Sequence, residues 1–260
     1  MKRGIKRSSR VVCIELRLIL SMIALFCLCS LAYADTIQEA AKRGDLESVT
    51  NFVSQGSNPD ARDSEGVTPL MYASEAGHLK VVEYLLQKGA SPNLRDSTYG
   101  MTALMVSSAE GRTEVVRLLI EAGADVNMKD NNLGATALLG AAEYGHTGVI
   151  QLLLAKGADV NASDKRGFRA LASAATNGHF ETVKLLVNNK ASVNAQDDKY
   201  GVTPLMGAAV NGHYSIVEFL LNNGADTMLK AKNGFTAIEF AKQKGHSRIV
   251  EFLEKHVNEK

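Results

Sequence analysis

The sequence predicts an all-α solenoid, in which short helix pairs stack side by side. Six glycines recur at intervals of 33 or 34 residues: Gly66, Gly100, Gly134, Gly167, Gly201 and Gly234. A second glycine follows each of them eleven residues later, and an apolar helical segment follows the second glycine. Fixed periods of about 20–50 residues are typical of solenoids, because one unit cannot bury its own apolar face and stacked units can.

Each part of the repeating unit has a physical role. Thr68 is placed to cap the first helix, and Pro69 in its first turn loses no needed donor. Gly77 is placed to end that helix in a left-handed conformation. The segment 81–86 then carries apolar residues at its first, second, fifth and sixth positions, which gives a helix with a broad buried stripe. Each unit is therefore predicted to be a helix, a turn and a second helix.

Two stretches of the unit resemble a known family. Residues 66–73 read Gly-Val-Thr-Pro-Leu-Met-Tyr-Ala, and residues 123–127 and 157–161 both read Gly-Ala-Asp-Val-Asn. These motifs closely resemble the ankyrin repeat, and the resemblance covers residues 36–260. It implies a β-turn or hairpin finger before each pair of antiparallel helices. About seven helix pairs are expected, caps included, in units 36–65, 66–99, 100–133, 134–166, 167–200, 201–233 and 234–260.

One position departs from the family pattern. Ankyrin repeats often carry histidine directly after Thr-Pro-Leu, and here the equivalent position holds other residues. They are Met71, Met105, Leu139, Ala172, Met206 and Glu239. The hydrogen bonds of that histidine are therefore expected to be missing, with side-chain packing in their place.

The first 34 residues have the pattern of a leader. Basic residues at 2–10 precede an apolar run from Leu18 to Leu31, and Ala-Tyr-Ala at 32–34 ends it. This pattern predicts a signal peptide over residues 1–34, cleaved after Ala34. The alternatives are an uncleaved anchor and a cytosolic chain. The segment 18–32 would span only about 22 Å as a helix, against the roughly 30 Å of a bilayer core. All three cysteines lie in this leader.

Charge and compartment follow from this prediction. The leader carries six of the 29 Lys and Arg residues and one of the 28 Asp and Glu residues, which leaves a net charge of −4 on residues 35–260. A mildly acidic chain without a basic patch is a poor binder of nucleic acid. The protein is expected in the periplasm or outside the cell, without membrane contact after cleavage. The residue pattern of the leader favours an exported bacterial protein over a eukaryotic secretory one.

Two recurring polar sets are candidates for metal binding. Histidine follows the second glycine at His78, His146, His179, His213 and His246. Adjacent units lie about 8–10 Å apart, so one ion would reach two of these side chains, whereas zinc takes three or four protein ligands. Hydrogen bonds to turn backbone are therefore expected instead. Aspartate recurs in the fingers at Asp63, Asp96, Asp130, Asp164 and Asp197, where turn capping is favoured over calcium binding. No metal and no cofactor is predicted.

The sequence contains none of the catalytic signatures sought. It has no Gly-x-Ser-x-Gly, no phosphate-binding glycine loop and no His-Glu-x-x-His. The sequon at Asn161 belongs to a repeated turn and is taken as incidental. A non-catalytic protein is expected, and a hydrolase with an unrecognised site is the remote alternative.

The variable surface residues are the candidates for binding a partner. Ankyrin proteins generally bind through the finger tips and the concave face of the first helices, which by resemblance indicates Glu75, Tyr99, Glu110, Leu133, Glu143, Tyr144, Asn177, Tyr200 and Asn211. Three fingers are one residue longer and place Tyr99, Leu133 or Tyr200 before the opening glycine. These side chains either anchor a partner or fold back on the neighbouring finger. The glutamates form an acidic strip for a basic partner, or only keep the protein soluble.

The expected function is that of a monomeric interaction scaffold that holds another protein. Two narrower versions remain open: an immunity-type inhibitor that blocks an exported enzyme or toxin, and a helper in oxidative-stress defence.

Overall fold

The computed structural model describes residues 36–258. The predicted signal peptide, its cleavage site after Ala34 and the three cysteines lie outside these residues. Fourteen α-helices occur in the described part of the chain, and they form seven pairs. The pairs are α2 (Ile37–Arg43) with α3 (Leu46–Ser54), α4 (Pro69–Ala76) with α5 (Leu79–Gln87), α6 (Ala103–Ala109) with α7 (Thr113–Glu121), α8 (Ala137–Glu143) with α9 (Thr147–Ala155), α10 (Ala170–Asn177) with α11 (Phe180–Asn188), α12 (Pro204–Val210) with α13 (Tyr214–Asn222), and α14 (Ala237–Lys244) with α15 (Ser247–Asn258).

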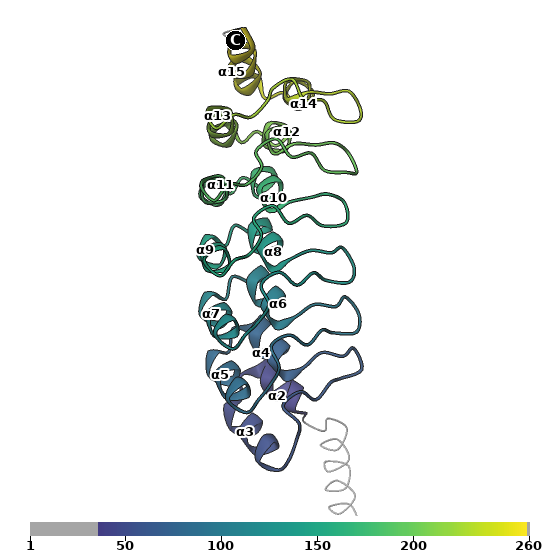
Figure 1. Ribbon diagram of the computed structural model, residues 1–260, viewed down its shortest axis with the longest axis vertical. Helices are drawn as coiled ribbons and strands as arrows, with labels where there is room; N and C mark the ends of the chain where they lie inside the picture. The colour runs from purple at the N-terminus through teal and green to yellow at the C-terminus, as the bar shows by residue number, and fades with distance from the viewer. Residues whose placement is uncertain (1–35, 259–260) are drawn as a thin grey trace, which may run out of the picture. The chain divides into compact units, whose positions relative to one another are not determined.

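The helix pairs of residues 37–258 are arranged in two rows. The first helices of successive pairs contact one another, from α2 through α14, and the second helices do so from α3 through α15. Figure 1 shows the finger loops projecting from the side of the first-helix row. The predicted all-α solenoid of about seven helix pairs is therefore confirmed, and the fingers and first helices share one side of it.

The core runs without interruption along the two rows. The leucine that follows the Thr-Pro or Thr-Ala opening in four units is buried, as at Leu104 and Leu138, both 1 % exposed. The second helices contribute a parallel column that includes Leu119 and Leu153, both 0 % exposed. Burying one leucine contributes roughly 2 kcal/mol relative to leaving it exposed. These residues touch neighbouring units as well as their own, so the stacking of units is what buries them.

In four units, the first helix is capped by the threonine that opens the unit. The hydroxyl groups of Thr102 and Thr136 accept hydrogen bonds from the backbone N–H three residues on, both at 3.3 Å. The expectation that packing alone replaces the missing histidine was incomplete. The Thr68 N–H donates to the sulfur of Met71 at 3.5 Å, and the Thr236 N–H donates to the Glu239 carboxylate at 2.8 Å. Side chains at the variant position therefore supply hydrogen bonds of their own in these units.

The histidines join each unit to the one before it. The His179 Nε2 lies 2.9 Å from the Glu143 carbonyl oxygen, and the His146 Nε2 lies 2.8 Å from the Ala109 carbonyl oxygen. The predicted hydrogen bonding to backbone is therefore confirmed, and the acceptor is the end of the preceding first helix. Of the six units with an opening glycine, one lacks the histidine, and there Arg112 donates from Nε to the Glu75 carbonyl at 3.0 Å.

A close approach explains the mid-repeat glycines. A Cβ atom added at Gly145 would lie 2.5 Å from the Nδ1 atom of His179, in a residue whose φ is +73°. The glycine therefore both permits the left-handed turn and leaves room for the ring of the next unit.

The finger aspartates cap turns, as predicted. The two carboxylate oxygens of Asp130 accept from the backbone N–H groups of Leu133 and Ala135, at 2.6 and 2.8 Å. Neighbouring fingers are joined by main-chain bonds, such as the one from the Lys165 N–H to the Leu133 carbonyl at 2.8 Å. The fingers of the described chain contain no regular strand, only an isolated antiparallel bridge between Ser163 and Arg169.

The side chain of Asn161 is fully engaged in the stack. Its Nδ2 donates to the Lys190 carbonyl at 3.2 Å, and its Oδ1 accepts from the Ser192 N–H at 2.8 Å. Asn127 makes the equivalent pair of bonds one unit earlier, to Gly157 and Asp159. The sequon asparagine is thus one member of a repeated hydrogen-bond ladder.

None of the helices between residues 36 and 258 combines the length and the apolar character that a membrane span requires.

Candidate functional site

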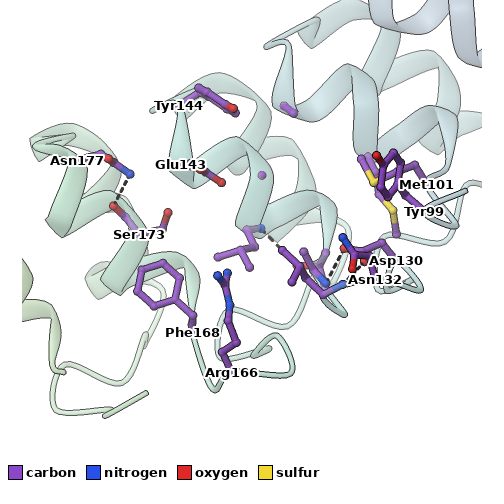
Figure 2. Close-up of a pocket in the computed structure, with 17 residues that line it drawn as sticks. Tyr99, Met101, Asp130, Asn132, Glu143, Tyr144, Arg166, Phe168, Ser173 and Asn177 are labelled. Carbon is purple, nitrogen blue, oxygen red and sulfur yellow. Dashed lines mark hydrogen bonds between the residues drawn. The ribbon is translucent and has the colours of Figure 1, made fainter. Parts of the chain in front are cut away.

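A groove of about 580 Å³ lies between the first helices and the fingers of three successive units. Its helix side is built by α6, α8 and α10, and its other side by the fingers that precede these three helices (Figure 2). A second groove of about 330 Å³ adjoins it, because Arg166 and Phe168 line both. We call these two together the concave groove.

Six of the nine predicted surface residues line the concave groove. Tyr99, Leu133, Glu143, Tyr144 and Asn177 line its larger part, and Tyr200 lines the smaller part. The remaining three lie outside it: they are Glu75, Glu110 and Asn211. Glu110 lies 3.8 Å from the exposed guanidinium group of Arg112. The Asn211 side chain donates to the carbonyl of Gly207 in its own helix at 3.0 Å.

The aromatic side chains of the fingers point into solvent from a fixed backbone. Tyr99 is 56 % exposed and Tyr200 is 57 % exposed. The backbone N–H of each donates to the aspartate at the start of its own finger, Asp96 or Asp197, at 2.6 Å. More than half of the surface of each residue is open to solvent, so the structure favours exposure over packing back onto the neighbouring finger. Leu133 is more covered, at 39 % exposed.

The floor of the concave groove is formed by small residues. The position six residues after each opening glycine holds Gly140, Ser173 and Gly207 in three successive units. The same position holds Tyr72 and Phe240 in the first and last units with the Gly opening. A Cβ atom added at Gly207 would lie 2.3 Å from the Thr176 Oγ1 atom, so this residue is required to be small. Sequence reasoning missed this position, although a run of three small residues between Val106 and Phe240 was a readable signal.

Arg166 and Phe168 were also missed among the lining residues. The Arg166 guanidinium group is 2.7 Å from the buried carboxylate of Asp164, and it lies 5.9 Å from the centre of the Phe168 ring. The finger therefore holds the arginine beside an aromatic ring at the point where the two parts of the groove meet. Both residues flank Gly167, so their place next to an opening glycine was the available signal.

Tyr72 lies at the N-terminal end of the same face. Its hydroxyl donates to the Asp63 carboxylate at 2.8 Å. Partial burial, and then the bond to Asp63, raise the pKa of Tyr72 to about 12. The side chain is thus held as a neutral donor.

The residues that line the concave groove can bind another molecule through apolar contacts and hydrogen bonds. Exposed rings and a small-residue floor suit apolar side chains, and Glu143, Asn177 and Arg166 supply polar groups at its edges. In the part of the chain that the structure describes, no three His, Cys, Asp or Glu side chains are grouped to hold a metal ion.

Known proteins resemble this chain over short segments. A protein of Arabidopsis thaliana, acyl-CoA-binding domain-containing protein 1, is 43 % identical over 56 residues, which are 22 % of this chain and 17 % of that protein. Human ankyrin repeat domain-containing protein 39 is 43 % identical over 54 residues, or 21 % of this chain and 30 % of that protein. Human ankyrin repeat family A protein 2 is 38 % identical over 64 residues, 25 % of this chain and 20 % of that protein. The matched segments span less than a third of each of these relatives.

The structural comparison and the family model cover most of the chain. The crystal structure of the human ASB11 ankyrin repeat domain matches 84 % of this chain and 97 % of its own, with a TM-score of 0.77 and 24 % sequence identity. The family model for ankyrin repeats (3 copies) matches residues 37–130, 128–197 and 194–260. These matches account for every helix pair described above, and the chain belongs to the ankyrin-repeat family.

Proposed function

We propose that this protein is a non-catalytic scaffold that binds another protein in its concave groove. Ankyrin repeats generally mediate binding to other proteins, and the fold is typically non-catalytic. The observation that supports this site most is the exposure of Tyr99, Tyr144 and Tyr200 around a floor of small residues. Tyrosine is a frequent interface anchor, because it buries a large area at a small cost in conformational entropy.

The rigidity of the fingers strengthens the proposal. Each finger that lines the groove is held by its aspartate and by a main-chain bond to its neighbour, such as the one from the Asn131 N–H to the Tyr99 carbonyl at 2.7 Å. A partner therefore meets a finger backbone that is already ordered, and little backbone entropy is lost on binding.

A capture experiment tests the site. The full-length chain serves as bait, together with a variant in which Tyr99, Tyr144 and Tyr200 are all changed to Ala. A control variant carries Leu79→Ala and Met228→Ala, which remove apolar side chains of 41 % and 63 % exposure outside the concave groove. We expect the control to retain the partner and the tyrosine variant to lose it, with unchanged circular dichroism for both. Equal recovery by all three baits would refute the groove as the site.

We also propose that the protein acts in the periplasm or outside the cell, as a monomer of exported bacterial type. The leader pattern in residues 1–34 supports the proposed compartment. Mass spectrometry of the protein recovered outside the cytoplasm should find Asp35 at its N-terminus, and sedimentation should give the mass of one chain. An intact N-terminus in the cytosol would contradict the proposed compartment.

A further inference from the structure

The larger part of the concave groove carries one charge without a partner, the carboxylate of Glu143. Lys199 lines the smaller part, where its ammonium group lies 4.8 Å from the centre of the Tyr200 ring. Glu143 ends α8, is exposed, and lines the groove between the α8 and α10 helices (Figure 2). Among residues 36–258, no cationic side chain forms an ion pair with it. The backbone carbonyls at the C-terminal end of α8 add partial negative charge at the same place, where a carboxylate is unfavourable for helix stability.

The other charged groups of the larger groove are compensated within the protein. Asp130 accepts three backbone N–H bonds, from Leu133, Gly134 and Ala135. The Arg166 guanidinium group is paired with Asp164 at 2.7 Å. Glu143 therefore determines the sign of the charge that the larger part of the groove offers to a partner. Complementarity requires a cation on the partner.

The neighbours of Glu143 suit a cation that has an apolar stem. Tyr144 follows it in the sequence and is 60 % exposed, and Phe168 lies on the facing finger (Figure 2). Arginine and lysine place a charged head on an aliphatic stem, and their heads also bind favourably over aromatic faces. Tyr99 and Leu133 extend the apolar lining beyond the carboxylate. Apolar side chains next to the cation are therefore accommodated as well.

From these observations we infer that the partner docks through a basic segment, in which an arginine or lysine bound to Glu143 is flanked by apolar side chains. The inference rests on the proposed function, since it names the chemistry of the partner for that same groove. An acidic segment attracted by Arg166 or Lys199 is the competing occupant. It is disfavoured beside Glu143, because the buried Asp164 already neutralises the Arg166 guanidinium group and Lys199 lines only the smaller part of the groove.

Selection from a random peptide library on the immobilised full-length chain tests the inference. The selected peptides are synthesised, and their dissociation constants are measured by fluorescence anisotropy. We expect them to carry Arg or Lys beside apolar residues. Glu143→Gln, which removes the charge and keeps the size, should weaken their binding about tenfold, the effect of losing one charged hydrogen bond. Glu218→Gln, a matched change of an exposed glutamate on α13, should leave binding unchanged.

Tyr144→Ala separates failure of this inference from failure of the proposed function. Peptides that lose affinity with Tyr144→Ala but not with Glu143→Gln, or that carry acidic residues, would overturn the basic partner and leave the groove as the site. Peptides indifferent to both changes, or a selection without binders, would overturn both.

Discussion

The contact between the mid-repeat glycine and the next histidine predicts a specific loss of stability. In Gly145→Ala, the new methyl group would lie 2.5 Å from the His179 ring, which must move and thereby lose its bond to the Glu143 carbonyl. Gly157→Ala is the matched control. Its φ of +84° is as unfavourable for alanine as the +73° of Gly145, but no atom lies within 4 Å of the added Cβ.

Both substitutions place alanine in a left-handed conformation, which lowers the free energy of unfolding by about 1 kcal/mol in each. Gly145→Ala also loses the histidine hydrogen bond, worth about 1 kcal/mol. The free energy of unfolding should therefore fall by about 2 kcal/mol in Gly145→Ala and by about 1 kcal/mol in Gly157→Ala.

Urea unfolding followed by circular dichroism measures both values. The double variant Gly145→Ala with His179→Ala should show less than additive destabilisation, because the ring that the methyl group displaces is already gone. Equal losses for the two single glycine variants would refute the proposed packing of histidine against glycine.

Three further predictions concern the core, a finger and a tyrosine. Leu138→Ala should lower the free energy of unfolding by about 3 kcal/mol through loss of buried contacts, measured by urea unfolding against the exposed control Leu133→Ala, which should cost less than about 1 kcal/mol. Asp130→Ala should destabilise by about 2 kcal/mol, because it leaves three finger N–H groups without their acceptor, and hydrogen exchange should quicken at residues 133–135. Tyr72 should ionise near pH 12 in a spectrophotometric titration. Since its folded pKa is raised, its contribution to stability is present below pH 10 and is lost as the pH rises towards 12, and Tyr72→Phe should abolish that loss. Ionisation of all tyrosines near pH 10 would contradict it.

The repeating part of the fold was predictable from the sequence because it depends on local chemistry. The opening threonine, the left-handed glycine and the apolar stripe each act within about ten residues, so their spacing fixes the helix pairs. The role of His179 was also predictable in kind, as a hydrogen bond to backbone. The role of Arg112 was not, since only the three-dimensional stack shows a guanidinium group reaching the carbonyl that the histidines reach elsewhere.

The candidate site was predictable only in outline. The exposed tyrosines could be placed on the fingers from the position of the opening glycine. The floor of the groove could not be predicted, because Gly140, Ser173 and Gly207 come from three units and form one surface only when the units are stacked. The ion pair of Arg166 with the buried Asp164 was missed for a related reason, since turn capping accounted for the aspartate without indicating that its second oxygen holds an arginine.

Hydrogen–deuterium exchange of the complex with the captured partner tests the central claim most directly. If the partner occupies the concave groove, amide protection should rise in the fingers at residues 98–101 and 131–135. Exchange should stay unchanged in α7, α9 and α11, which are the second helices of their pairs. Protection confined to these second helices would contradict the proposal that the protein binds through its fingers and first helices.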